Sequence, residues 1–256
     1  MRTRGNGLKI RLLIGVAIVA FAFLKKCSQQ EVNPYTGRKQ TITISPNQEI
    51  AIGLSSRNQM AQQHGGLYPD ERLQAYVDMV GEKLVNASMA RETPYKFEFH
   101  LLADPNTINA FALPGGQVFI TYALLSKLKN EDQLAGVLGH EIGHVLGKHS
   151  AERIGETEFW KTVSSGASVG ADMGGLIGGI GQKTLLKNGR DDELESDDLG
   201  VRFMIDAGYN PNEMIGVMEI LKASAGPNRV PEFQSTHPDP DNRIAHIKAA
   251  IKKYKY

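Results

Sequence analysis

Apolar residues recur at helical spacing between residues 130 and 150, beside a group of polar residues that could bind a metal. Asn130 suits an N-cap and Gln133 the capping-box position, and two acidic residues follow the cap, where the helix dipole favours them. At about 100° per residue, the apolar side chains fall on one broad arc: Leu134, Val137, Leu138, Ile142, Val145 and Leu146. The pattern predicts a helix that buries this arc.

Other segments also show patterns that predict secondary structure. Ser45-Pro46 predicts the start of a helix that runs to about Gln63, and apolar residues at helical spacing predict a second helix over 69–88. Alternation of apolar and polar residues over 97–101 predicts a short, half-buried strand. Residues 109–120 predict two strands joined by a Pro-Gly-Gly turn. The expected fold class is α+β, helix-rich, with a small sheet.

The start of the chain has a different pattern. Residues 12–24 are all apolar, with basic residues on both sides. The run is short for a membrane span, but flanking lysines can extend it, and no small-residue cleavage site follows. We therefore expect an uncleaved signal anchor over residues 1–30, with the N-terminus in the cytoplasm and residues 31–256 in the periplasm or outside the cell. Cys27 leaves a lipoprotein as an alternative, although Lys26 precedes it where a small residue is expected.

Composition narrows the function classes. The 256 residues are 41% hydrophobic and 22% charged, which suits one globular domain with a sizeable core. The net charge of +1 argues against a nucleic-acid partner. Because Cys27 is the single cysteine, the chain can form neither an internal disulfide nor a cysteine-based zinc site. A metal would have to use His, Asp or Glu.

The predicted helix over 130–150 carries such ligands. His140 and His144 are four residues apart, so both imidazoles project from one face and can bind one zinc ion. Glu141 beside them can act as the general base that activates a zinc-bound water. Four glycines line the other side of His140: Gly136, Gly139, Gly143 and Gly147. Each costs roughly 0.5–1 kcal/mol in a helix, so we expect another backbone or a substrate chain to approach them closely.

Two sources of a third ligand can be compared. The extended motif H-E-x-x-H-x-x-G-x-x-H requires histidine where Ser150 stands, and His149 on a continuous helix would face away from His140. The acidic segment from Asp191 predicts a new helix start, on which Glu193 and Asp197 share a face. We therefore expect Glu193 to be the third ligand and Asp197 to accept a hydrogen bond from a ligating imidazole.

Between these elements, residues 166–181 are rich in glycine and contain little charge. They lack the lysine and hydroxyl pair of a phosphate-binding loop. The pattern indicates a loosely packed helix or a mobile flap, and its apolar character also suits contact with a partner or a membrane.

Taken together, these motifs resemble the HtpX/Ste24-like family of HExxH zinc metalloendopeptidases, with its BepA, LoiP and Oma-type members. The resemblance rests on His140-Glu141-x-x-His144, on Glu193-x-x-x-Asp197, and on three further segments: residues 33–40, 109–116 and 235–238. It extends over residues 31–256. Ser196 and Asp198 depart from the residues common around the acidic motif, and the single apolar run does not imply prenylated substrates.

The resemblance implies a gluzincin-type zincin that holds one Zn²⁺ per chain, with the sheet edge beside the active-site cleft. It implies that Asn109, Ala110, Phe111 and Ala112 form an edge strand, on which a peptide substrate would lie as an extra strand. It also raises an active-site role for His237, which precedes a helix start at Asp239-Pro240: stabilising the oxyanion, or contacting zinc in a latent state.

The expected function is zinc-dependent hydrolysis of peptide bonds in misfolded or envelope proteins, as part of protein quality control, with Glu141 and His237 as catalytic residues. The alternative is a zinc-containing chaperone or adaptor in envelope protein assembly, with minor proteolysis. The presence of Glu141 favours the enzyme, because a structural zinc site needs no general base.

Overall fold

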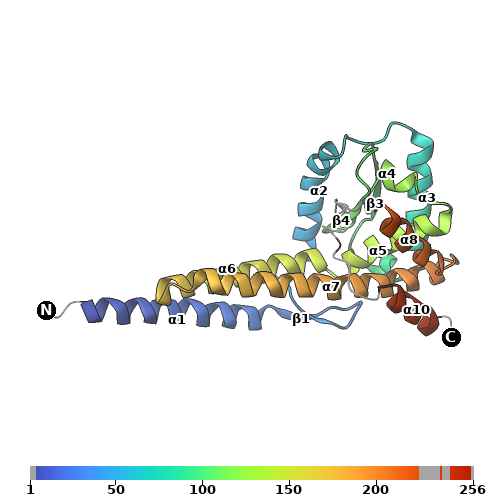
Figure 1. Cartoon of the computed structure of the whole chain (residues 1–256). Coiled ribbons are helices and arrows are strands. Elements are labelled where there is room, and N and C mark those ends of the chain that lie inside the picture. The colour runs from blue at the N-terminus through green and yellow to red at the C-terminus, as the bar shows by residue number, and fades with distance from the viewer. Residues whose placement is uncertain (1–3, 225–236, 238–242, 255–256) are drawn as a thin grey trace. The chain divides into compact units, whose positions relative to one another are not determined.

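The computed structural model describes residues 4–224, 237 and 243–254 (Figure 1). By their internal contacts, the residues group into two compact units. The first unit is Met1–Ile44 with Ala151–Asn188, and the second unit is Ser45–Ser150 with Gly189–Tyr256. The division of the chain at residue 30 stays a prediction, and segment 151–188 groups with the N-terminal residues.

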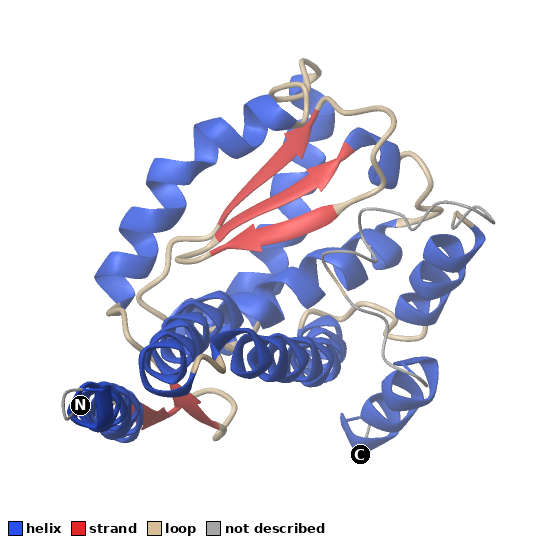
Figure 2. Cartoon of the chain, turned by 60° about the vertical axis from the view of Figure 1, so that its left-hand side comes forward, coloured by secondary structure: helices blue, strands red, loops and turns tan. Residues whose placement is uncertain are grey.

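A three-stranded sheet lies at the centre of the second unit (Figure 2). It contains β3 (Glu98–Leu102), β4 (Ala110–Leu113) and β5 (Gln117–Thr121), in the order β3-β5-β4. The β4–β5 pair is the predicted hairpin, and its turn places Gly115 and Gly116 at φ 81° and 104°, where glycine is favoured. β3 pairs with β5 in parallel, which leaves β4 at the edge.

Helices cover both faces of this sheet. On one face, Phe99 of β3 packs against Gly81 of α3 (Glu71–Ala87). On the other, Leu102 and Phe119 form a cluster with Ala61 of α2 (Pro46–Gln63). The predicted capping box at Ser45 is present at the start of α2. The central strand β5 is thus buried along its whole length, whereas the residues of β4 after Ala110 are partly exposed.

The helix predicted over 130–150 is α5 (Glu131–Leu146), and it ends earlier than the apolar pattern suggested. Asn130 caps it by accepting a hydrogen bond from the Gln133 backbone N–H. The Gln133 side chain accepts from the Lys129 N–H, one residue before the cap. The other elements of this unit are η1 (Met89–Glu92), α4 (Tyr122–Leu125), α8 (Glu213–Ala223) and α10 (Arg243–Tyr254). The predicted helix start at Asp239-Pro240 lies outside the described residues.

The first unit contains the long helix α1 (Arg4–Ser28), whose segment Gly7–Ser28 is long and apolar enough to cross a membrane. A short antiparallel hairpin follows, β1 (Gln30–Val32) with β2 (Lys39–Thr41), which the polar pattern of this segment did not predict. The glycine-rich stretch is helical. It belongs to α6 (His149–Ala171) and α7 (Gly174–Asp206), which both continue across the boundary between the units. The helix-rich α+β class is confirmed.

Candidate metal centre

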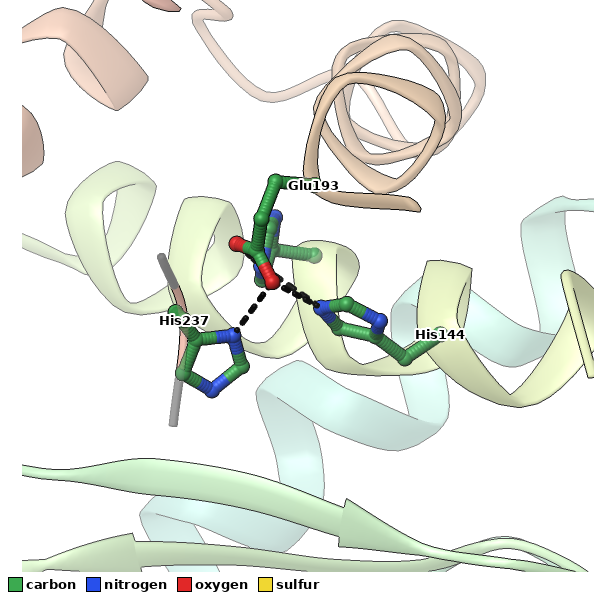
Figure 3. A group of neighbouring side chains, drawn as sticks. His144, Glu193 and His237 are labelled. Carbon is green, nitrogen blue, oxygen red and sulfur yellow. Dashed lines mark hydrogen bonds and ion pairs between the residues drawn. The ribbon is translucent and has the colours of Figure 1, made fainter. Parts of the chain in front are cut away.

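His144 of α5 faces Glu193 of α7 (Figure 3), and His140 on the same helix also contacts Glu193. His140 Nε2 and His144 Nε2 lie 3.0 Å apart. Glu193 Oε2 is 3.3 Å from His140 Nε2, and Glu193 Oε1 is 3.4 Å from His144 Nε2. The structure therefore brings together the three residues that the sequence singled out as ligands.

Small residues allow α7 to lie this close to α5. A Cβ at Gly139 would lie 3.3 Å from the carbonyl oxygen of Gly200, and one at Gly143 would lie 3.0 Å from that of Ser196. The expected approach of another backbone is confirmed at these two glycines. The side chain of Glu193, three residues before Ser196, thereby reaches the histidines.

The prediction that the acidic segment from Asp191 begins a helix is wrong. The segment lies well inside α7, which begins at Gly174 and runs without interruption to Asp206. Glu193 is 2% exposed and Asp197 is fully buried. A solvated acidic helix start is therefore excluded, and these carboxylates are balanced by buried partners.

Asp197 and Arg243 support the first histidine from behind. Asp197 Oδ1 lies 2.9 Å from His140 Nδ1, and Arg243 donates to both oxygens of Asp197 at 2.7 Å. Burial raises the pKa of Asp197, but the charge of Arg243 and the hydrogen bond with His140 outweigh it and lower that pKa. Asp197 thus remains an acceptor that orients His140 with its Nε2 toward Glu193 and His144.

The two imidazoles have opposite pKa shifts. Burial lowers the pKa of His140, but hydrogen bonds with Asp197 and Glu193 raise it to about 9. Burial dominates at His144 and lowers its pKa to about 4. The Glu193 pKa lies well below its usual value, because the nearby histidines outweigh the effect of burial.

The geometry and the chemistry of this group fit a zinc ion. One donor atom from each of His140, His144, Glu193 and His237 lies within 4.8 Å of the others. Two ligand atoms of a tetrahedral zinc with bonds of about 2.0–2.1 Å are about 3.3 Å apart. Glu141 is fully buried beside this group, and neither of its carboxylate oxygens has a hydrogen-bond partner among the described residues. A cation with bound water would compensate this buried charge.

His149 lies beside the candidate ligands, which corrects the expectation that it faces away. That expectation assumed one continuous helix, but α5 ends at Leu146 and Lys148 adopts φ 54°, so the chain turns before α6 begins. His149 Nδ1 consequently lies 2.8 Å from His144 Nδ1, and its Nε2 lies 2.8 Å from Glu195 Oε2. The missed signal was Gly147-Lys148, a break that helical spacing alone does not reveal.

His237 lies between the ligand group and the sheet. Its Nδ1 is 3.1 Å from Glu193 Oε1, and its Nε2 is 3.1 Å from the carbonyl oxygen of Ala110 and 3.6 Å from Glu141 Oε1. Burial lowers its pKa, but the charges of Glu193 and Glu141 outweigh this effect and raise the pKa. His237 thus connects the candidate centre to β4.

The predicted substrate strand coincides with β4 and the residue before it. The Asn109 carbonyl accepts a hydrogen bond from Thr121 N at the end of β5. Successive carbonyls alternate in direction along a strand, so the Ala110 carbonyl points to the free side of β4, where His237 meets it. Phe111 and Ala112 follow on β4, both partly exposed. No described strand pairs with that side of β4.

Comparison with known proteins agrees with these features. Residues 71–251 match the profile of Peptidase family M48. The chain is 32% identical over 229 residues to the beta-barrel assembly-enhancing protease of Yersinia pestis, which covers 84% of this chain and 46% of that protein. It is 30% identical over 236 residues to the mitochondrial metalloendopeptidase OMA1 of Schizosaccharomyces pombe, which covers 90% and 69% respectively. Identity to the beta-barrel assembly-enhancing protease of Escherichia coli is 29% over 247 residues, 49% of that protein. The chain thus spans about half the length of these two bacterial relatives.

Proposed function

The chain belongs to peptidase family M48, and from this membership we propose that it is a zinc-dependent metalloendopeptidase. The observation that carries the proposal is the buried carboxylate of Glu141, which has no hydrogen-bond partner in the described structure and lies beside a two-histidine, one-glutamate group. A structural metal site does not require a carboxylate that is not a ligand, whereas hydrolysis requires a general base at this position.

In this proposal, His140, His144 and Glu193 hold one zinc ion per chain. When bound, zinc supplies Lewis acidity, which lowers the pKa of a water molecule at the site from 15.7 toward about 7 and polarises the peptide carbonyl. Asp197 keeps the His140 Nε2 directed at the site through its contact with His140 Nδ1.

Glu141 takes the proton from the attacking water and later delivers it to the leaving amine. Its lack of a hydrogen-bond partner leaves both oxygens available for this transfer. His237, whose pKa is raised, can donate a hydrogen bond to the oxyanion that develops on the peptide carbonyl. In the present geometry, the same side chain contacts Glu193 and Ala110 instead, which supports a second role in covering the site.

The substrate in this proposal is an extended segment of a protein. It would add to the sheet along residues 109–112, using the free edge of β4. The bacterial relatives carry the name of beta-barrel assembly, which supports misfolded or envelope proteins as targets. We place the enzyme at a membrane through α1, with the second unit in the periplasm or outside the cell. Cys27 is exposed near the end of α1, where a lipid could be attached to it.

The test compares the full chain with Glu141→Gln, a change that keeps the shape of the side chain. We expect both proteins to bind one zinc, and only the unchanged protein to cleave casein or unfolded outer-membrane protein, with cleavage abolished by a chelator. A glutamine variant that cleaves at the original rate would refute the mechanism. Absence of cleavage in both, together with a glutamine variant that still supports envelope assembly in cells, would favour the chaperone or adaptor.

A further inference from the structure

The first unit contains a helical hairpin whose surface does not suit water. It consists of the end of α6 and the start of α7, residues 159–182. We propose that this hairpin inserts into the lipid bilayer beside α1, as a second membrane element of the chain. The inference rests on the proposed anchoring role of α1 and goes beyond it, because the hairpin comes from a segment more than 130 residues later in the chain.

Around Gly15, the hairpin packs on α1 without an intervening layer of side chains, while Ala22, Phe159 and Val163 form an apolar cluster further along the contact. A Cβ at Gly15 would lie 2.6 Å from the carbonyl oxygen of Gly166 and 2.7 Å from Gly170 Cα. Figures 1 and 2 both show α6 and the first part of α7 alongside α1. Contacts between helices through Gly-x-x-x-Gly are typical of membrane interiors, where close van der Waals packing replaces the hydrophobic effect.

Ion pairs align the charged ends of the two elements. At one end, Lys25 pairs with Glu158 at 3.4 Å and Lys26 with Glu156 at 2.8 Å. At the other end, Arg11 pairs with Asp172 at the tip of the hairpin, at 3.2 Å. α6 therefore runs antiparallel to α1, and the apolar run of α1 lies opposite the stretch between Glu158 and Asp172.

The hairpin has no charged residue in most of the part that lies opposite the apolar run of α1. Residues 162–171 of α6 and 174–182 of α7 contain no Asp, Glu, Lys or Arg. Lys161 and Lys183 lie toward the Glu158 end, where long side chains can reach the membrane surface. Between Lys25 and Arg11, α1 rises by about 20 Å at 1.5 Å per residue, most of the roughly 30 Å hydrocarbon thickness of a bilayer. The hairpin would reach the same depth.

The side chains of the hairpin expose apolar surface on the same unit as α1. Met173 is 47% exposed, Leu176 is 62% and Ile180 is 45%, while Leu13 on α1 is 69% exposed. From residue 162 to the end of α6, the polar side chains are serine and threonine hydroxyls, which can bond to carbonyls of their own helix. A lipid surface continuous with that around α1 is the occupant that suits this composition.

Tryptophan fluorescence can test the insertion, because Trp160 is the single tryptophan of the chain. In a Trp160→Phe background, one tryptophan is placed at a time by Leu176→Trp or Ile180→Trp in the hairpin, Leu13→Trp on α1, and Leu54→Trp on α2. All four positions are exposed, so the fold should tolerate the larger ring. The full chain is reconstituted into phosphatidylcholine–phosphatidylglycerol vesicles, with or without brominated acyl chains, and acrylamide is added to the water.

We expect brominated lipid to reduce emission at Leu176, Ile180 and Leu13 by twofold or more, and acrylamide to quench the Leu54 position alone. Quenching by lipid at Leu13 but only by acrylamide at both hairpin positions would overturn the insertion and leave the anchor in place. If no position is quenched by lipid, the anchoring role of α1 fails, and the insertion with it. Lipid quenching in the hairpin without quenching at Leu13 would contradict the packing of the two elements side by side in a bilayer.

Discussion

His144 and His149 are joined by a hydrogen bond between their Nδ1 atoms, 2.8 Å apart. When His144 offers Nε2 to a metal, its proton lies on Nδ1 and is donated to His149. His149 then carries its own proton on Nε2, which it donates to Glu195 Oε2 at 2.8 Å. The chain of contacts from Glu195 through His149 therefore fixes the tautomer and the orientation of His144, as Asp197 does for His140.

We expect His149→Ala to weaken zinc binding by about 10- to 100-fold, because partners behind a ligand typically contribute that much to metal affinity. Glu195→Gln should have a smaller effect, since its amide oxygen can still accept from His149. Competition with a chromogenic chelator measures the affinity. His100→Gln is the control, because His100 bonds to Gln117 on the sheet and touches none of the ligands. Unchanged affinity in His149→Ala would show that this contact does not position His144.

The close approach of α5 and α7 leads to a second prediction. Gly143→Ala places a Cβ 3.0 Å from Ser196 O and 3.1 Å from Ser196 Cα, so α7 must move away. We expect the free energy of unfolding to fall by about 1–3 kcal/mol, as for other overpacked sites, and zinc affinity to fall with it because Glu193 shares α7. Thermal unfolding and metal competition measure the two effects.

Gly136→Ala on the same helix is the matched control for this change. Its Cβ would meet Met214 and Met204 at 3.5–3.6 Å, an ordinary contact distance. The higher helix propensity of alanine should then leave stability unchanged or raise it by about 0.5–1 kcal/mol. Equal effects at both glycines would mean that the spacing between the two helices does not limit the site.

Features that depend on neighbouring residues in the sequence could be predicted from local patterns. The cap at Asn130, the capping box at Ser45 and the Gly115-Gly116 turn depend on neighbouring residues, and the structure confirms them. The uninterrupted path of α7 through Gly189 could not be predicted in this way, because packing stabilises the helix there against its local preference. The pairing of Asp197 with Arg243, 46 residues later, leaves no periodic trace in the sequence.

Asp104, in the loop after β3, should make the free energy of unfolding depend on pH at the acidic end of the range. Burial raises the pKa of Asp104, but hydrogen bonds from Thr107 and Asn106, together with contact with His64, lower it to about 2 from 3.8. A carboxylate with a lowered folded-state pKa stabilises the protein above its unfolded-state pKa, and this contribution is lost as pH falls through the folded-state value.

Asp104→Asn should therefore lower the free energy of unfolding at pH 7 by about 1 kcal/mol, since the amide keeps the backbone hydrogen bonds but loses the charge. The difference from the unchanged protein should shrink as pH falls from about 4 toward 2. Thermal unfolding in excess chelator measures it without interference from metal loss. Asp206→Asn is the control, because its contact with Arg202 is exposed and 3.9 Å long. A constant difference across this pH range would contradict the assigned role of the Asp104 charge.

The position of His237 separates its two proposed roles. Its Nε2 lies 3.1 Å from the Ala110 carbonyl oxygen on the free side of β4. An added substrate strand would use this oxygen as a hydrogen-bond acceptor. In the Glu141→Gln background, where cleavage is blocked, we expect His237→Ala to strengthen binding of an extended peptide severalfold, because the acceptor is no longer occupied. Fluorescence anisotropy of a labelled peptide measures this affinity, with His100→Gln in the same background as the control.

The catalytic role is read separately, from kcat of the single His237→Ala variant with Glu141 intact. Loss of a donor to the oxyanion should lower kcat by about 10²-fold. Stronger peptide binding together with lower kcat would mean that one imidazole both covers the site and serves the reaction. Unchanged peptide binding would show that the contact with Ala110 does not compete with substrate, because a carbonyl released by the mutation would otherwise be available to the incoming strand.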